Sequence, residues 1–158
     1  MKIIFIILAA FLFTVSCQSV DKNNKEAVAK ITDSNATPAI RGYDPISYHT
    51  IGRPIMGNGN HVSIYKGEQF LFISKENKAK FDSNPEKYTP AYGGWCAYGV
   101  AVNKKFHADP LVWEIVDGKL YLNLDNKIKG IWAKDIPGNI SKADNNWEAI
   151  EHRESASL

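Results

Sequence analysis

Residues 88–101, YTPAYGGWCAYGVA, form the stretch around which the rest of the chain is organised. It contains Cys96, the only cysteine outside the N-terminal region, and a Gly93-Gly94 pair set among four aromatic residues. Glycine tolerates positive φ and lets another group approach the backbone closely. We therefore expect a tight corner beside the thiol, with a hairpin and a helix before it and a second hairpin and further helices after it.

The length and the charge of the chain limit the classes of protein to consider. The chain has 158 residues and a formal net charge of +2. This length favours one domain, and the near-neutral charge gives no sign of the basic patch that nucleic-acid binding requires. We expect no nucleic-acid partner, and the sequence identifies no protein partner.

Residues 1–16 have the features of a secretory signal. Residues 3–15 form an apolar run that is too short for a membrane-spanning helix of about 20 residues. The run ends at Ser16 and Cys17 in a way that resembles the bacterial lipobox, although Thr14 stands where an aliphatic residue is usual. We expect lipid on Cys17 and an exported protein anchored to a bacterial membrane, facing the periplasm or the exterior. The alternative is an ordinary signal peptide in which Cys17 is incidental.

Residues 17–38 are predicted to be a flexible tether. They are poor in large apolar side chains and rich in Asn, Lys, Asp and Ser, so they cannot bury enough surface to offset the entropy of ordering. We expect the folded domain to cover residues 39–152 and residues 153–158 to be a frayed tail. If Cys17 carries lipid, the domain has a single thiol and no intrachain disulfide.

Two β-hairpins are predicted from alternating apolar residues around short polar turns. Residues 61–65 and 69–73 flank one turn, and residues 112–116 and 119–124 flank Asp117-Gly118. An Asp-Gly pair between alternating strands is a strong signal for a type I′ turn. The predicted core face of the second hairpin consists of Trp113, Ile115, Leu120, Leu122 and Leu124.

The helices are predicted from capping residues and helical spacing. The predicted helices cover residues 75–83, 126–134 and 139–152, and Pro85 is expected to open a short turn over residues 85–88. Asp44-Pro45 is interpreted as a turn, residues 100–106 as extended chain or loop, and residues 136–138 as a break. The predicted class is α+β, with two antiparallel β-hairpins packed with three to four short helices in a single small domain.

Few residues of the domain can carry chemistry. A thiolate together with imidazoles suits copper or zinc, and Cys96, His107 and His49 are the candidate ligands. The chain has no CxxC or HxxH spacing, so these ligands would have to converge from separate segments. Two alternatives stay open: Cys96 is a buried, inert thiol, or it is a nucleophile with His107 as its base.

Several of these motifs resemble the YHS domain family. The shorter match consists of Tyr43-Asp44-Pro45, Tyr65-Lys66-Gly67, residues 70–74, Phe81 and residues 85–88. A longer match is similar to exported bacterial YHS-domain proteins and adds residues 92–97, Asp109-Pro110, Trp113, residues 115–123, residues 135–138 and residues 146–147. Together they cover most of the predicted domain.

The resemblance implies a link to heavy metals but supplies no ligands. The family occurs in contexts such as copper-transporting ATPases and is described as a metal-binding module. Its cysteines follow the Asp-Pro turn and surround the start of the helix, and this chain has other residues there. Those positions hold Ile46, Ser47, Ile73, Ser74 and Asn77. Only Cys96 belongs to the motif of the exported subgroup, so a metal site would have to be built around it.

We therefore expect a membrane-tethered extracytoplasmic binding protein for a transition metal, with copper as the first candidate and zinc as the second. The site would lie around Cys96 with help from His107 or His49, and we do not expect an enzyme. The alternatives are an interaction module with a buried Cys96 and, third, a Cys96-dependent enzyme. The surroundings of Cys96 discriminate among them: a histidine within roughly 4 Å favours metal, a fully apolar surround favours the module, and an open pocket with a base and backbone N–H donors favours the enzyme.

Overall fold

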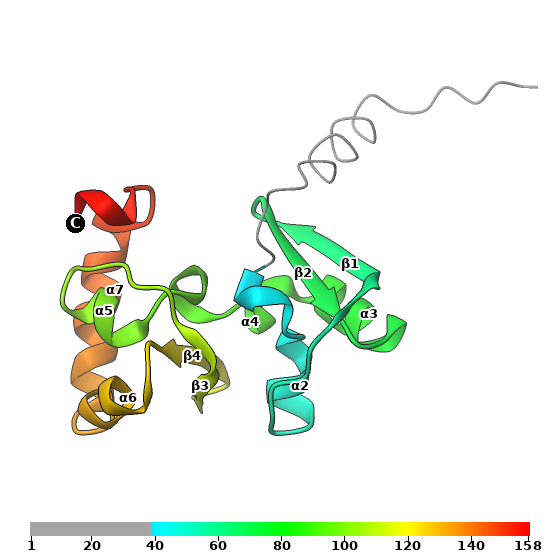
Figure 1. The fold of residues 1–158 in the computed structure, drawn as a ribbon, viewed down its shortest axis with the longest axis horizontal. Coiled ribbons are helices and arrows are strands. Elements are labelled where there is room, and N and C mark those ends of the chain that lie inside the picture. Colours follow the sequence, from blue (N-terminus) through cyan, green and yellow to red (C-terminus); the bar gives the residue numbers. More distant parts are fainter. Residues whose placement is uncertain (1–38) are drawn as a thin grey trace, which may run out of the picture. The chain divides into compact units, whose positions relative to one another are not determined.

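The structure is a computed structural model that describes residues 39–158, in which two β-hairpins are packed with six α-helices (Figure 1). The predicted α+β class with two antiparallel hairpins is confirmed. The signal, the lipid site at Cys17 and the tether were predicted for residues that lie outside this described part. Among residues 39–158, no helix combines the length and the apolar character that crossing a membrane requires.

The first hairpin joins β1 (Asn58–Tyr65) to β2 (Glu68–Phe72) in antiparallel register. Its turn is Lys66-Gly67, and both residues have positive φ, 51° and 84°. The turn therefore has two residues, and Glu68, predicted within it, is already the first residue of β2. Tyr65 faces Glu68 across the hairpin, and the register shifts between Asn58 and Val62.

The second hairpin joins β3 (Asp109–Val116) to β4 (Lys119–Asn123) around Asp117-Gly118. Both turn residues have positive φ, 49° and 77°, as the predicted type I′ turn demands. Trp113 lies opposite Leu122, and Ile115 lies opposite Leu120, as expected for one face. Leu124, placed on the same face by the sequence, is 39% exposed because the strand ends one residue earlier.

Three helices begin at residues that the sequence predicted to open a helix or a short turn. They are α3 (Lys75–Ser83), α4 (Pro85–Tyr88) and α6 (Asn126–Trp132). Ser74, Asn84 and Asp125 each accept a hydrogen bond from a backbone N–H of the first turn. This is the expected role of an N-cap side chain, which satisfies a donor that the helix itself leaves free.

The other three helices differ from the prediction. Asp44-Pro45 begins α2 (Pro45–Thr50) instead of a turn, because Asp44 caps the helix and proline suits its first position. Asp135 likewise caps a helix, α7 (Ile136–Ile150), whose second residue is Pro137. This helix therefore begins within the predicted break. A short helix, α5 (Ala97–Ala101), follows Cys96 where the sequence predicted chain without helix from residue 100.

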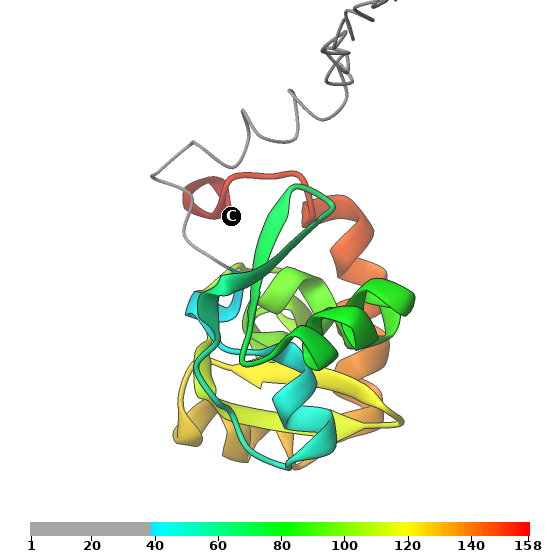
Figure 2. The same ribbon diagram turned by 90° about the vertical axis from the view of Figure 1, so that its right-hand side faces the viewer.

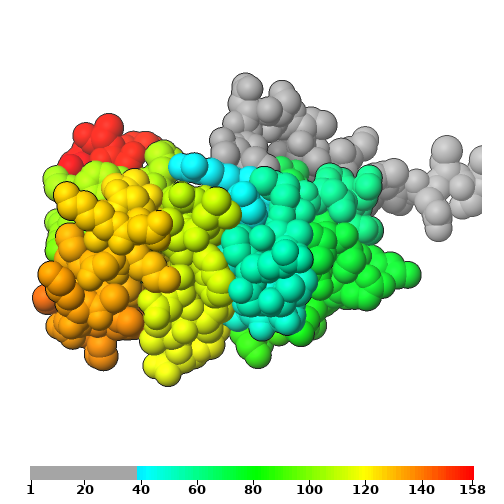
Figure 3. All heavy atoms as spheres, turned by 60° about the horizontal axis from the view of Figure 1, so that its bottom comes forward, coloured from blue at the N-terminus to red at the C-terminus, as the bar shows by residue number. Residues whose placement is uncertain are grey.

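The buried side chains form two cores, one on each side of the β3–β4 hairpin. Leu120 and Leu122 belong to the first core, with β1, β2, α2 and α3, and Tyr121 points the other way into the second core with α5 and α7. This follows from the alternation of side chains along a strand. Figures 1 and 2 show α7 and the β1–β2 hairpin on opposite sides of β3–β4, and Figure 3 shows the same order on the surface.

The last residues, which we expected to fray, form a short 3₁₀ helix at Ser155–Ser157. Leu158 packs against the second core. Lys105 holds the same region, because its Nζ donates hydrogen bonds to the carbonyl oxygens of Glu151 at 3.0 Å and Arg153 at 2.8 Å. These contacts fix the chain after α7 against the loop that follows α5.

Candidate functional site

Asp44 forms a buried hydrogen-bond network at the place where the resemblance suggests a metal site. Its carboxyl accepts bonds from the backbone N–H groups of Ile46 at 2.8 Å and Ile73 at 2.9 Å, and from Asn77 Nδ2 at 2.7 Å. Ile46, Ile73 and Asn77 are three of the positions at which cysteines were expected by analogy. In this chain they position one carboxyl group, which joins α2 to the end of β2 and to α3. The Asp-Pro motif therefore has a structural role here.

Cys96 is fully buried and surrounded by backbone donors. Its Sγ accepts bonds from the N–H groups of Gly99 at 3.4 Å and Leu124 at 3.3 Å, and donates to Asn123 Oδ1 at 3.7 Å. Burial raises the pKa of the Cys96 thiol, and this effect outweighs the opposing influence of the N–H donors. A buried thiol with a raised pKa is a poor metal ligand and a poor nucleophile. This environment combines the burial expected of a structural thiol with backbone N–H donors, so it is not the fully apolar surround that was expected for an interaction module.

The two candidate histidines lie in other surroundings. His107 is exposed and stacks on Trp95, with ring centroids 4.7 Å apart. His49 lies on α2 and meets Tyr88 edge to face at 5.3 Å, in a cleft that Cys96 does not line. Within residues 39–158, no three His, Cys, Asp or Glu side chains are grouped so that they could hold a metal ion. Cys96, His107 and His49 are therefore not grouped as one set of metal ligands in the described part of the chain.

The corner at residues 91–94 is as tight as the glycines predicted. Tyr92, Gly93 and Gly94 all have positive φ, at 55°, 60° and 80°. A tyrosine in this region of backbone space is strained and needs support from its surroundings. The Tyr92 hydroxyl donates to Asp144 Oδ1 at 2.8 Å, and the ring packs between Tyr121 and Trp147. The corner thus anchors β4 to α7 and serves the second core.

A second aromatic surface beside this corner is occupied by a side chain of the protein itself. The Lys105 ammonium lies 4.8 Å from the ring centroid of Trp95 and 5.9 Å from that of Trp147. A cation over an aromatic face is attracted by the negative charge density of the ring. Because Lys105 also binds the carbonyls after α7, this cluster holds the C-terminal segment in place.

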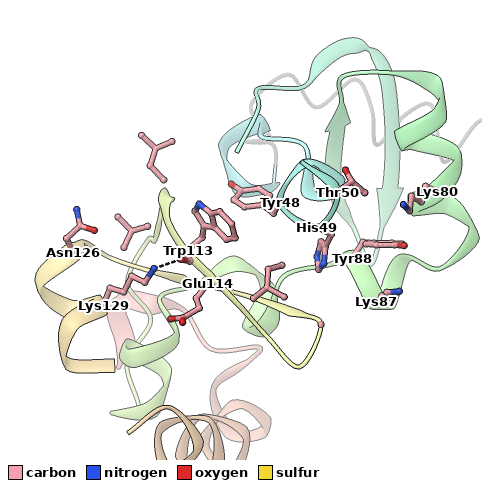
Figure 4. Close-up of a pocket in the computed structure, with 14 residues that line it drawn as sticks. Tyr48, His49, Thr50, Lys80, Lys87, Tyr88, Trp113, Glu114, Asn126 and Lys129 are labelled. Atoms are coloured by element: carbon pink, nitrogen blue, oxygen red, sulfur yellow. Dashed lines mark hydrogen bonds between the residues drawn. The ribbon is translucent and has the colours of Figure 1, made fainter. Parts of the chain in front are cut away.

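One candidate site is a cleft of about 860 Å³ between α2 and β3, which we call the basic cleft (Figure 4). His49 and Thr50 of α2, Trp113 and Glu114 of β3, and side chains from α3, α4 and α6 line it. Clefts of roughly 300–1,000 Å³ are typical of small-molecule sites. The cleft runs along the face of the hairpin that carries Trp113.

Aromatic contacts make one wall of the basic cleft rigid. The Tyr48 hydroxyl donates to the Pro110 carbonyl at 3.0 Å, and the Tyr48 ring meets Trp113 edge to face at 5.3 Å. Tyr48 and Tyr88 are buried, whereas His49 and Trp113 are only half-buried and present part of their rings to the cleft. The wall is therefore formed before any ligand arrives, which lowers the entropic cost of binding.

Lysines dominate the charge of the cleft. Lys80 and Lys87 lie at the end formed by α3 and α4, Lys129 lies at the end formed by α6, and Glu114 is the single acidic residue of the lining (Figure 4). Lys129 Nζ donates to the Trp113 carbonyl at 2.6 Å, so its charge is fixed at the wall. The net charge of the whole chain is only +2, so this local excess does not reflect the overall composition.

The positive charge of the lysines affects the pKa of His49. Burial, and then the nearby charges of Lys87, Lys119 and Lys80, lower the pKa of the His49 imidazole. Its Nε2 is buried and has no hydrogen-bond partner within the described residues. Buried polar atoms almost always have partners, so an unpaired one calls for an explanation. A cationic neighbourhood opposes a metal cation at His49 and favours an anion.

The sequence analysis identified His49 but missed the lysines and Trp113 as residues of one site. Lys80 and Lys87 come from the consecutive helices α3 and α4, whereas Lys129 comes from α6 much further along the chain, and single lysines on exposed helical faces are ordinary. Only the packing of α2 against β3 brings them to one cleft. No motif in the sequence signals this arrangement.

We compared the chain with protein-family models, with curated proteins and with solved structures, and none of these comparisons found a match. The resemblance to YHS domains consequently rests on the motifs quoted above. The fold defines a small α+β domain, and its function is inferred below from the basic cleft.

Proposed function

We propose that this protein is an extracytoplasmic binding protein, tethered to a bacterial membrane through lipid on Cys17, and that its domain holds a small organic ligand in the basic cleft. The observation that carries the proposal is the preformed aromatic wall beside the unpartnered Nε2 of His49. A ligand that enters beside His49 gains apolar contact with Trp113. It can supply the missing hydrogen bond once the imidazole turns, because Nε2 is buried in the present conformation.

The burial of Cys96 supports a ligand-binding site in another part of the domain. Its sulfur is engaged by the N–H groups of Gly99 and Leu124, and its burial removes it from any ligand that approaches from solution. Cys96 thus ties the corner to the end of β4, while the half-buried rings of His49 and Trp113 remain open to a ligand. We therefore place binding at the basic cleft and not at the thiol.

Chemical-shift mapping on the isotopically labelled full chain tests this proposal. Benzenesulfonamide supplies a flat ring without charge, and benzenesulfonate supplies the same ring with a negative charge. We expect at least one of the two compounds to shift the backbone resonances of α2 and of β3 around Trp113, and Trp113→Ala to weaken that binding.

Phe106→Ala is the matched control, because Phe106 is a half-exposed aromatic residue that does not line the cleft. This change should leave the binding of both compounds as it is in the wild type. Shifts confined to other parts of the domain, or equal effects of the two substitutions, would contradict binding at the basic cleft.

A further inference from the structure

We infer that the ligand of the basic cleft is an organic anion and that its binding is coupled to the uptake of a proton by His49. This inference rests on the proposed function, since it names the chemical class of the ligand for the same cleft. It is argued from the charged groups around His49, from how they are held, and from the unpaired nitrogen of the imidazole.

Charged and titratable side chains reach the neighbourhood of His49 from every element packed around it. Lys80 of α3, Lys87 of α4 and Lys119 of β4 act on the charge of His49, and Tyr88, Glu114 and Lys129 line the same cleft. Lys119 lies outside the lining, where the charge of Glu86 acts on it. The lining itself therefore has three lysines and one glutamate. No salt bridge pairs Lys80, Lys87 or Lys129 with a carboxylate in the described part of the chain, so their positive charge remains available to a ligand.

Two of these lysines are held in place by backbone carbonyl groups. Lys129 Nζ donates to the Trp113 carbonyl at 2.6 Å, and Lys119 Nζ donates to the Glu86 carbonyl at 2.8 Å. A charge that is already fixed loses little side-chain entropy when a ligand binds. Lys119 is half-buried, and its lowered pKa reflects the cost of placing its charge there. An anion nearby would reduce this cost.

His49 makes the preference for an anion dependent on pH. Its protonated form is disfavoured by burial and by the positive charge of the lysines. An anion in the cleft offsets that charge. When the imidazole turns so that its buried, unpartnered nitrogen faces the cleft, the protonated ring can donate a charge-assisted hydrogen bond to the anion. The anion therefore raises the pKa of His49, and by reciprocity a proton on His49 strengthens binding of the anion.

The sign of the pH effect follows from this coupling. In the free protein His49 titrates below its ordinary value of 6.5, and in the complex it titrates at a higher pH. Between these two values the complex holds a proton that the free protein lacks. Affinity for the anion should consequently rise as the pH falls through this interval.

Benzenesulfonate and benzenesulfonamide form a matched pair for the test, because they share shape and ring and differ in charge throughout the range from weakly acidic to neutral pH. Titrations of the full chain should show benzenesulfonate binding roughly three- to fivefold more tightly than the sulfonamide at neutral pH, the size expected for partly exposed ion pairs. Its affinity should rise further toward pH 5.5, and calorimetry in two buffers of different ionisation enthalpy should show proton uptake.

Three variants separate the contribution of lysine charge to ligand affinity from the contribution of His49. Lys87→Gln should weaken the binding of benzenesulfonate and leave the sulfonamide unaffected, whereas Lys142→Gln, a matched change of an exposed lysine outside the cleft, should affect neither compound. His49→Gln should remove the pH dependence and the proton uptake. Binding in this variant should persist near pH 8, where His49 carries no proton.

The outcomes separate this inference from the proposed function. Equal binding of the two compounds at α2 and β3, without proton uptake, would overturn the inference of an anion and leave the proposed cleft intact. If neither compound shifts the resonances of the cleft, both fail. If inorganic sulfate binds as tightly as benzenesulfonate, the site recognises charge alone and the organic part of the inference is wrong.

Discussion

The sulfur of Cys96 accepts a hydrogen bond from the backbone N–H of Leu124, 28 positions further along the chain, at 3.3 Å. Leu124 is the first residue after β4, so this bond ties the corner before α5 to the end of the second hairpin. The same sulfur accepts the Gly99 N–H at the start of α5. Cys96 therefore stabilises the fold as a buried hydrogen-bond acceptor. For this reason we place ligand binding at the basic cleft.

Replacing Cys96 by alanine should destabilise the domain. The change removes the partner of two buried or half-buried N–H groups and leaves a small void, for an expected loss of about 1–3 kcal/mol in the free energy of unfolding. Denaturant unfolding of the wild type and of Cys96→Ala measures the difference. In the native wild type, peptide mass spectrometry should also find Cys96 unlabelled by a thiol reagent until denaturant is added. Labelling at the rate of an unfolded peptide would refute a structural thiol.

Asp44→Asn should be costly although the two side chains have nearly the same shape. The carboxyl of Asp44 accepts from three donors, and an amide would turn one of its acceptors into a further donor. We expect a loss of about 2–4 kcal/mol, because buried donors are left unpaired. Asp117→Asn is the matched control at an exposed turn residue with φ of 49°, where asparagine is tolerated. Equal stability of the two variants would show that the Asp44 network contributes little.

The sequence predicted those elements whose signals are local. Asp117-Gly118 dictates its turn, and Ser74 and Asp125 each cap a helix, because these preferences are set within a few residues. Asp44-Pro45 was misread, since the same pair suits a turn and a helix start, and only the donors from Ile73 and Asn77 decide between them. The basic cleft could not be predicted, because α6 with Lys129 lines the same cleft as α3 and α4 only after the chain has packed.

His49 should make the stability of the domain dependent on pH. Its lowered pKa means that the unfolded chain takes up this proton before the folded chain does as the pH falls below about 6.5. The free energy of unfolding should therefore decrease with decreasing pH between the unfolded and the folded pKa. His49→Gln should reduce this slope, measured as the difference between wild-type and variant unfolding curves at pH 7.5 and 5.5.

The membrane tether is tested by removing residues 1–16. If Cys17 carries lipid, the wild type should appear in the membrane fraction. A variant from which residues 1–16 have been removed should be released from that fraction, because the polar residues 18–38 offer little apolar surface. Fractionation followed by intact-mass analysis measures both. A wild-type protein whose mass shows an unmodified Cys17 would contradict lipid attachment, whatever the fractionation shows.

The histidine ring resonances of the full chain, followed by NMR during a titration with benzenesulfonate, test the central claim most directly. The chain has four histidines, and only His49 lines the basic cleft, so His61, His107 and His152 serve as internal controls. We predict that the His49 resonances shift and that its pKa rises with ligand, while the other three histidines keep theirs. A titration in which His49 does not respond, or in which His107 responds in its place, would contradict binding at this cleft.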